Sequence, residues 1–175
     1  MNNIKVKIER LKNPTQDDVK DINILLPQQA RLPRFLNLKE LKRVTGQDFF
    51  HMYVARAKIG NRSSIVGMGS VIFYWVPTGL ISFIEELTVD EHFRGLKIGL
   101  RLVQKLVDDA KKKKAKHITT YTNFDRLAAN GVYQRLNFFK KEANLYRMNI
   151  FLPKPSSKRA VNEIIRLQKK RAALL

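Results

Sequence analysis

Residues 85–99, Glu-Glu-Leu-Thr-Val-Asp-Glu-His-Phe-Arg-Gly-Leu-Lys-Ile-Gly, are the stretch of this sequence that decides its fold. The stretch begins as a β-strand, and the basic, glycine-containing turn that follows opens a long amphipathic helix. Free N–H groups at a helix N-terminus, the positive end of the helix dipole and the adjacent Arg94 together form an anion site. The stretch therefore predicts a turn that binds a pyrophosphate, directly downstream of two carboxylates.

Length and composition limit what surrounds this turn. The chain has 175 residues, which suit one domain, so we expect a main domain over residues 1–150 and a basic C-terminal extension over residues 151–175. Cysteine is absent, which excludes disulfides, thiolate catalysis and cysteine-based metal sites. The three histidines are scattered along the chain, so we expect no metal.

The net charge points to the kind of partner. Thirty-four Lys and Arg against fifteen Asp and Glu give a formal charge of +19, more than solubility requires and enough to attract phosphate-rich surfaces. The nearly uncharged stretch 65–76 is too short to cross a bilayer, and the N-terminus lacks the apolar core of a secretion signal. We expect a cytoplasmic protein without a membrane span.

Hydrophobic periodicity and turn residues predict the remaining elements. We expect helices from about residue 15 to Pro27, over 36–44, 98–114 and 125–136, and in the tail. We expect strands over 4–8, 52–59, 64–76, 80–89, 117–122, 138–139 and 143–150, with a tight turn at 60–62. This order describes a mixed α/β sheet.

Two motifs in this order resemble the Gcn5-related N-acetyltransferases, and the resemblance covers roughly residues 4–150. The first is the turn 94–99, and the second is the helix 128–138, which carries Tyr133 and is followed by Leu, Asn and Phe. Tyr146 also matches small bacterial members. The resemblance implies a mostly antiparallel central sheet flanked by helices, transfer of acetyl from acetyl-CoA to an amine, and no metal.

The chain departs from the family pattern at two glycine positions. Lys97 stands where the family has the middle Gly of its turn, and we expect a helical rather than a left-handed backbone there, because a Cβ makes the left-handed region costly. Asn137 replaces the Gly after the Tyr133 helix, and Asn tolerates the left-handed conformation best among the other residues.

The resemblance also implies where acetyl-CoA binds. The family has a β-bulge near residues 87–89 that exposes backbone groups to the pantetheine arm, and its basic turn holds the pyrophosphate. Asn130 is added because it shares a helix face with Arg126 and Tyr133. The candidate cofactor-binding residues are Leu87, Val89, Arg94, Gly95, Leu96, Lys97, Ile98, Gly99 and Asn130.

An acetyltransferase needs a proton acceptor for the attacking ammonium and usually a donor for the departing thiolate. Glu85 and Glu86 are adjacent in the strand, so their side chains are expected on opposite faces, and we favour Glu85 as the base with Glu86 in reserve. Tyr133 matches the family position whose phenol protonates the thiolate. The alternatives are solvated or salt-bridged carboxylates and a tyrosine that only packs.

The tail is the part that acetyl transfer explains least. From Phe151 onward it carries seven Lys or Arg and one Glu. Val161, Ile164 and Ile165 are expected to dock on the domain, and the cations to contact phosphates. These cations are Lys158, Arg159, Arg166, Lys169, Lys170 and Arg171.

This tail supports a second function class, an RNA-binding or ribosome-associated protein that uses the same fold with weak or no activity. The Lys111–Lys114 run fits either a solvated helix end or a polyanion contact. The sequence leaves open the identity of the amine acceptor, whether protein or small molecule, and whether the chain forms a homodimer.

Overall fold

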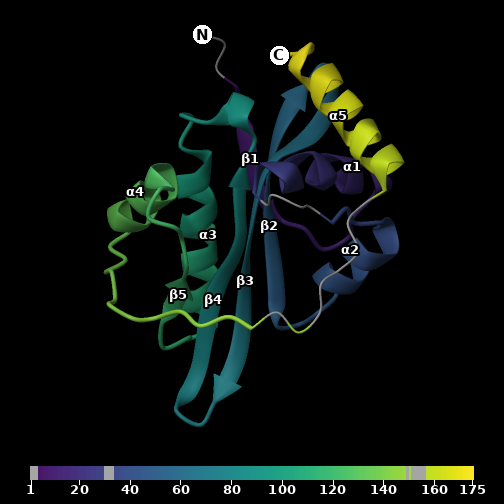
Figure 1. The fold of residues 1–175 in the computed structure, drawn as a ribbon. Coiled ribbons are helices and arrows are strands. Elements are labelled where there is room, and N and C mark those ends of the chain that lie inside the picture. The colour runs from purple at the N-terminus through teal and green to yellow at the C-terminus, as the bar shows by residue number, and fades with distance from the viewer. Residues whose placement is uncertain (1–3, 30–33, 149, 151–156) are drawn as a thin grey trace.

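A five-stranded sheet forms the centre of the computed structural model, which describes residues 4–29, 34–148, 150 and 157–175. The spatial order of its strands follows the chain, with antiparallel pairing throughout except for β5, which runs parallel to β4 (Figure 1). The mixed, mostly antiparallel sheet is therefore confirmed. The strands are β1 (Val6–Arg10), β2 (Phe50–Ile59), β3 (Arg62–Val76), β4 (Gly79–Val89) and β5 (Ile118–Thr120).

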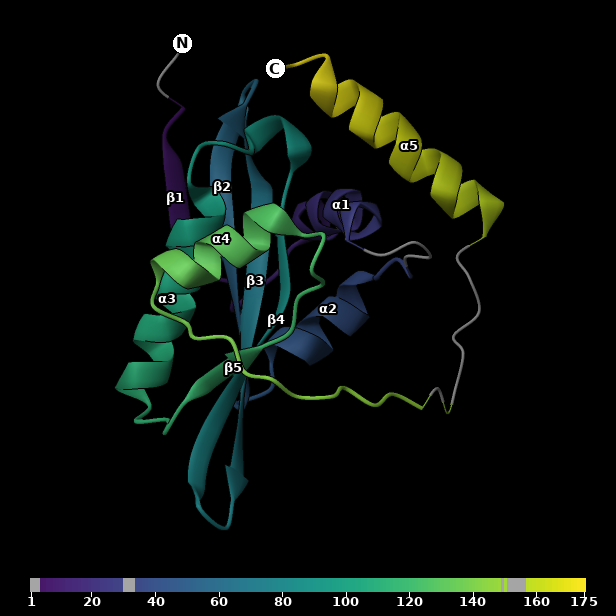
Figure 2. The ribbon, with the colours of Figure 1, turned by 60° about the vertical axis from the view of Figure 1, so that its left-hand side comes forward.

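Helices cover both faces of this sheet (Figure 2). One face packs against α1 (Gln16–Leu25) and α2 (Leu38–Thr45), and the other against α3 (Ile98–Lys112) and α4 (Leu127–Arg135). The C-terminal helix α5 (Lys158–Ala172) lies on α1. Short 3₁₀ turns follow α1 at η1 (Leu26–Gln28) and precede the basic turn at η2 (Glu91–Phe93).

Local sequence signals begin both helices of the first layer. Thr15 and Asp18 form a capping box in which each side chain bonds the other residue's backbone N–H, and Asn37 and Glu40 repeat it at α2. At the other end of α2, Gly46 is the C-cap, and its N–H donates to the carbonyl of Lys42. These caps satisfy backbone donors that have no partner within the helix.

Two glycines in β3 let α3 pack closely on the sheet. A Cβ on Gly67 would lie 3.3 Å from the side chains of Ile98 and Leu102, and a Cβ on Gly69 would lie 3.3 Å from Leu106. Ile98, Leu102 and Leu106 are almost fully buried. This contact fixes the N-terminal end of α3, and with it the basic turn that precedes the helix.

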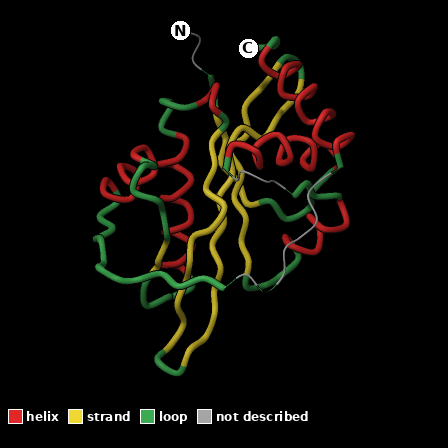
Figure 3. Tube along the Cα trace, in the orientation of Figure 1, coloured by secondary structure: helices red, strands yellow, loops and turns green. Residues whose placement is uncertain are grey.

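The strands expected over 138–139 and 143–150 are absent from the described residues 138–148 and 150, which Figure 3 draws as loop up to residue 148. Phe139, Tyr146 and Met148 are all more than 80% exposed. The prediction was wrong because apolar residues form a strand only where a neighbouring strand offers hydrogen bonds. Here β5 is three residues long and pairs only with β4 among the described residues.

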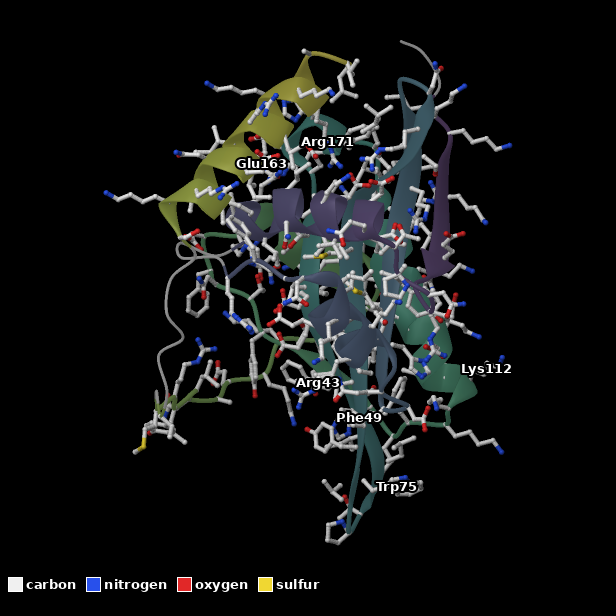
Figure 4. The ribbon with its side chains drawn as sticks, turned by 90° about the vertical axis from the view of Figure 1, so that its right-hand side faces the viewer. Arg43, Phe49, Trp75, Lys112, Glu163 and Arg171 are labelled. Atoms are coloured by element: carbon white, nitrogen blue, oxygen red, sulfur yellow. The ribbon has the colours of Figure 1, made fainter. Side chains whose placement is uncertain are left out.

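The helix α5 is held to the body by a buried arginine. The two terminal nitrogens of Arg171 donate to Asp21 Oδ1 at 2.5 Å and to Asp90 Oδ2 at 2.9 Å, and all three side chains are at least 95% buried (Figure 4). Gln168 adds a hydrogen bond to the carbonyl of Ile24. The expectation that Arg171 contacts phosphates was therefore wrong, because an ion pair inside the protein occupies its guanidinium.

The apolar face of α5 is narrower than expected. Ile164 is buried, whereas Val161 and Ile165 remain more than a third exposed. The division of the chain at residue 150 stays a prediction, since α5 packs on α1 and forms buried contacts with it.

Within the described ranges, every helix is too short or too polar to cross a membrane.

Replacing Arg171 by Met should destabilise the protein by about 3 kcal/mol, because Asp90 and Asp21 would each lose a buried cationic partner. Urea denaturation would measure the loss. Lys170→Met is the matched control, since Lys170 is the exposed neighbouring cation and its removal should change stability by less than about 0.5 kcal/mol. Equal stability of the two variants would contradict a role for Arg171 in holding α5.

Candidate active site

A β-bulge in β4 opens the candidate site. Met68 pairs with Thr88, but two residues further along β3 Ser70 pairs with Glu85, so β4 contains one residue more than its partner. Glu86 lies in this bulge with a left-handed backbone, φ 58°. Pairing with β5 ends at Ile84, so among the described strands none follows β4 on that side beyond the bulge. The sheet thus opens between β4 and the segment after β5.

A small cleft of about 60 Å³ occupies this opening. The end of β4 forms one wall, and the segment after β5 together with α4 forms the other. Its lining residues are Gln29, Ile84, Glu85, Glu86, Leu87, Thr120, Tyr121, Thr122, Arg126, Ala129 and Tyr133. The structure therefore gathers the three predicted catalytic residues, Glu85, Glu86 and Tyr133, around one space.

Both glutamates line this cleft, so the expectation of opposite faces was wrong. The bulge and the left-handed backbone at Glu86 interrupt the two-residue alternation on which that expectation depended. Burial and the neighbouring Glu85 carboxylate raise the pKa of Glu86, while a hydrogen bond from Gln29 opposes the rise. Glu86 is thus a carboxylate that holds its proton to higher pH than an ordinary glutamate.

Tyr133 lies across the cleft on α4. Its side chain is buried, packs against Phe138 with ring centroids 5.4 Å apart, and accepts a hydrogen bond from the Thr120 hydroxyl at 3.3 Å. Burial raises the pKa of Tyr133, with hydrogen bonding by Thr120 opposing the rise and Glu85 adding to it. The phenol is therefore protonated at neutral pH and available as a donor.

The turn between η2 and α3 has the form of an anion site. Gly95 has φ 81°, and a Cβ there would meet open space, so the backbone of this turn is accessible. The first helical hydrogen bond runs from Arg101 to the carbonyl of Lys97, which leaves the N–H groups of Ile98, Gly99 and Leu100 ahead of it. Because the side chain of Ile98 is buried, only its backbone can face a ligand.

Lys97 does not have the helical backbone that the sequence predicted. It is the N-cap of α3 with φ 56° and ψ 19°, which is the left-handed conformation. The packing of α3 against Gly67 fixes where the helix begins, and the chain must turn through Lys97 to reach that point. Asn137 also has a left-handed backbone, φ 60°, as expected.

The side chains of Gln28 and Gln29 tie the turn and the bulge to the end of α1, and Asp90 holds η2. Gln28 accepts from the N–H of Glu91 at 2.9 Å and lies 3.5 Å from the guanidinium of Arg94. Gln29 accepts from the Thr88 hydroxyl at 2.7 Å, and Asp90 accepts from the N–H of His92 and caps η2. Sequence reasoning missed these residues because they belong to no recognisable motif. Gln28 and Gln29 follow Pro27, and Asp90 precedes the turn 94–99.

Two further polar residues differ in their availability. Asn130 donates to the carbonyls of Asn123 at 3.0 Å and Arg126 at 3.1 Å, so its amide N–H groups hold the start of α4 and it does not line the cleft. The hydroxyl of Thr122 lines the cleft and is buried, and it has no hydrogen-bond partner among the residues that the structure describes. A buried polar atom of this kind is a position where a bound ligand can supply the missing partner. The described residues hold no cluster of His, Asp and Glu suited to a metal ion.

Comparison with known proteins gives the family. Residues 20–138, more than half of the chain, match the model of the acetyltransferase (GNAT) family, and the chain belongs to this family. No curated protein matches it significantly.

Solved structures share this fold at low sequence identity. A transcriptional regulator from Bacillus halodurans C-125 has 24% identity and a TM-score of 0.67, over 82% of this chain and 99% of that one. Glucosamine-6-phosphate N-acetyltransferase from Arabidopsis thaliana has 19% identity and a TM-score of 0.68, over 83% and 99%. An aminoglycoside N-acetyltransferase in complex with CoA has 15% identity and a TM-score of 0.67, over 85% and 97%.

The left-handed Lys97 gives a prediction that separates strain from charge. Lys97→Gly should be more stable than Lys97→Ala by about 1 kcal/mol, because only Gly relieves the Cβ clash of the left-handed conformation. Thermal unfolding would measure the difference. Both variants lose the same charge, so equal stability would show that the backbone at Lys97 carries no strain.

Proposed function

We propose that this protein is an acetyl-CoA-dependent N-acetyltransferase that acts on a primary amine by direct attack. The observation that carries the proposal is the β4 bulge, which brings Glu85 and Glu86 to a cleft shared with Tyr133. Membership of the acetyltransferase family supports it. A carboxylate and a phenol around one cleft are an acceptor and a donor for the two proton transfers of acetyl transfer.

The residues present fit acetyl-CoA. The turn 94–99 offers accessible backbone at Gly95, the first N–H groups of α3 and two exposed cations, Arg94 and Lys97, which would hold the pyrophosphate. The opened edge of β4 at Leu87 and Val89 would face the pantetheine arm, although the Val89 carbonyl also lies 3.4 Å from Arg94 Nε. The bound molecule supplies an activated acetyl thioester.

We propose Glu86 as the proton acceptor and Glu85 as the carboxylate that holds the incoming ammonium. Both side chains line the cleft, so the face of the sheet does not decide which of them is the base. The raised pKa of Glu86 brings its basicity closer to that needed at neutral pH. Glu86 is steadied by Gln29, which is itself fixed by the Thr88 hydroxyl. A glutamate anchored in this way can accept a proton from the ammonium directly or through one water.

Tyr133 is proposed as the donor to the departing thiolate. The raised pKa keeps its phenol protonated, and the hydrogen bond from Thr120 leaves the phenolic proton available to another acceptor. The buried ring and its contact with Phe138 hold the hydroxyl in place. Glu86 removes one proton from the ammonium and the phenol gives one to the thiolate; the second proton that the nitrogen loses as the amide forms restores the phenol.

The acceptor class follows from local charge. Two adjacent carboxylates in a protein with a net charge of +19 attract a cation to this cleft. A primary ammonium, on a small molecule or on a protein, matches this requirement. Neighbouring structures include enzymes whose names specify amino sugars and aminoglycosides, which also carry amines.

The alternative function is an RNA-binding or ribosome-associated protein with weak or no catalytic activity. The version of it in which the C-terminal tail binds RNA is less well supported. The buried Arg171 is unavailable to phosphates, and its ion pairs assign α5 a structural role. Five exposed cations remain on α5, at Lys158, Arg159, Arg166, Lys169 and Lys170.

Tyr133→Phe should lower the turnover number about 100-fold while leaving the affinity for acetyl-CoA nearly unchanged, because it removes one proton and little packing. Calorimetric titration with acetyl-CoA would measure affinity, and release of free thiol from acetyl-CoA in the presence of a panel of primary amines would measure turnover. Absence of acetyl-CoA binding to the unmodified protein would refute the proposed function, whereas unchanged turnover would remove Tyr133 from the mechanism.

The pH profile distinguishes the two glutamates. The base must be deprotonated, so the rate should rise with pH through the pKa of Glu86, above the ordinary glutamate value of 4.5. Glu86→Gln should lower turnover about 100-fold and remove this rising limb. Glu85→Gln is the matched control and should mainly raise KM for the amine. If Glu85→Gln alone removes the limb, the assignment is reversed.

A further inference from the structure

The end of the molecule that holds the C-terminus of α3 combines exposed aromatic rings with lysines. We call it the basic–aromatic end and define it by Arg10, Phe49, Trp75, Lys112, Lys113 and Lys116. Trp75 is 78% exposed and Phe49 is 51% exposed, values that are high for the largest apolar side chains. Figure 4 shows Phe49, Trp75 and Lys112 toward one end of the molecule and Arg171 toward the other.

Strand geometry explains why these rings are exposed. Phe73 is buried under α3, and the ammonium of Lys113 lies 5.3 Å from its ring centroid. Trp75 is two residues further along β3, so it points to the same face of the sheet but lies beyond the helix that covers Phe73. Phe49 is held beside them, because its carbonyl accepts from the N–H of Phe73 at 2.8 Å.

A pocket of about 430 Å³ lies at the same end, since it is lined by Asp48, the residue before Phe49, and by Lys113, whose ammonium lies over the Phe73 ring. Arg10, Lys112 and Lys113 line it, together with His51, Asp48 and Asp109. Asp109 is engaged inside the protein, since His51 Nδ1 lies 2.5 Å from its carboxylate. Burial and Asp109 raise the pKa of Tyr53 to about 12, so the Tyr53 phenol stays protonated as a second donor to Asp109.

The balance of charge at this end is therefore positive. Asp48 remains as an exposed carboxylate on the pocket, whereas Arg10, Lys112 and Lys113 face it, and Lys111, Lys114 and Lys116 are exposed close by in the chain. The proposed acetyl-transfer chemistry uses none of these side chains. A pocket with three cations in its lining, at the end of the molecule that also exposes Phe49 and Trp75, is suited to a ligand that alternates phosphates and planar bases.

We propose that the basic–aromatic end binds single-stranded nucleic acid. Arg10, Lys112 and Lys113 would contact successive phosphates, while Trp75 and Phe49 would stack on bases, which every sequence can provide because each base has a π-face. An anionic membrane is a poorer match, since its surface favours a continuous apolar face, and here cations separate the rings. This inference is independent of the proposed acetyl transfer.

The chain offers a direct probe, because Trp75 is its single tryptophan. Titration with an oligouridylate of about 12 nucleotides, and with the matching oligodeoxythymidylate, should quench Trp75 fluorescence by stacking. The affinity should fall steeply between about 50 and 200 mM salt. Vesicles containing anionic lipid form the comparison arm.

Variants then test the position of the site by anisotropy of a labelled oligonucleotide. Trp75→Ala should weaken binding about tenfold or more, and Lys112→Gln with Lys113→Gln should also reduce the salt dependence by about two phosphate contacts. The matched control is Lys169→Gln with Lys170→Gln, which removes the same charge from exposed positions on α5. It should have a much smaller effect.

Three results would overturn the proposal. The first is no quenching by either oligonucleotide, and the second is an equal loss of affinity in the α5 control, which would show diffuse electrostatic attraction only. The third is a response of Trp75 to vesicles without one to oligonucleotides, which would indicate a membrane surface. Acetyl transfer by Trp75→Ala should equal that of the unmodified protein, so each of the two proposals can fail alone.

Discussion

One extra residue in β4 is the constraint on which the rest of the site depends. The bulge at Glu86 ends the regular two-residue alternation, brings both glutamates to one cleft and lies where pairing with β5 has stopped. Without it, β4 would present one carboxylate to each face, as a regular strand does. The bulge is supported from several sides, because Ser70 donates to the carbonyl of Glu85, and Gln29 joins Glu86 to Thr88.

The second organising feature is how the protein uses its few acidic residues. Asp18, Asp21, Asp90 and Asp109 have side chains that are at most 10% exposed; the first three pair with arginines, and Asp109 lies 2.5 Å from His51 Nδ1. Because these carboxylates have partners inside the protein, few acids remain to neutralise the cations of the surface in a chain with a net charge of +19. Because acidic side chains are scarce, two adjacent glutamates in one cleft are unusual. For the same reason, the lysines around the end of α3 remain available to a polyanion.

Sequence reasoning succeeded where short-range signals agree with the fold. The capping residue Thr15, the amphipathic α3, the basic turn and the left-handed Asn137 were all predictable, because each depends on residues within a few positions of one another. It failed at Lys97, at the last strands and at Arg171. Each failure involves a distant partner: α3 packed on Gly67 for Lys97, the missing sheet edge for residues 138–148, and Asp21 and Asp90 for Arg171.

The sequence by itself therefore determined the family, the order of most elements and the residue types of the site: two adjacent glutamates, a tyrosine helix and a basic turn before α3. Only the tertiary structure decided that both glutamates face the cleft of Tyr133, that Asn130 donates to the carbonyls of Asn123 and Arg126 instead of lining that cleft, and that exposed rings and lysines lie at one end. The physical reason is that bulges, buried ion pairs and surface patches arise from contacts between residues far apart in the chain, which local propensity and periodicity do not encode.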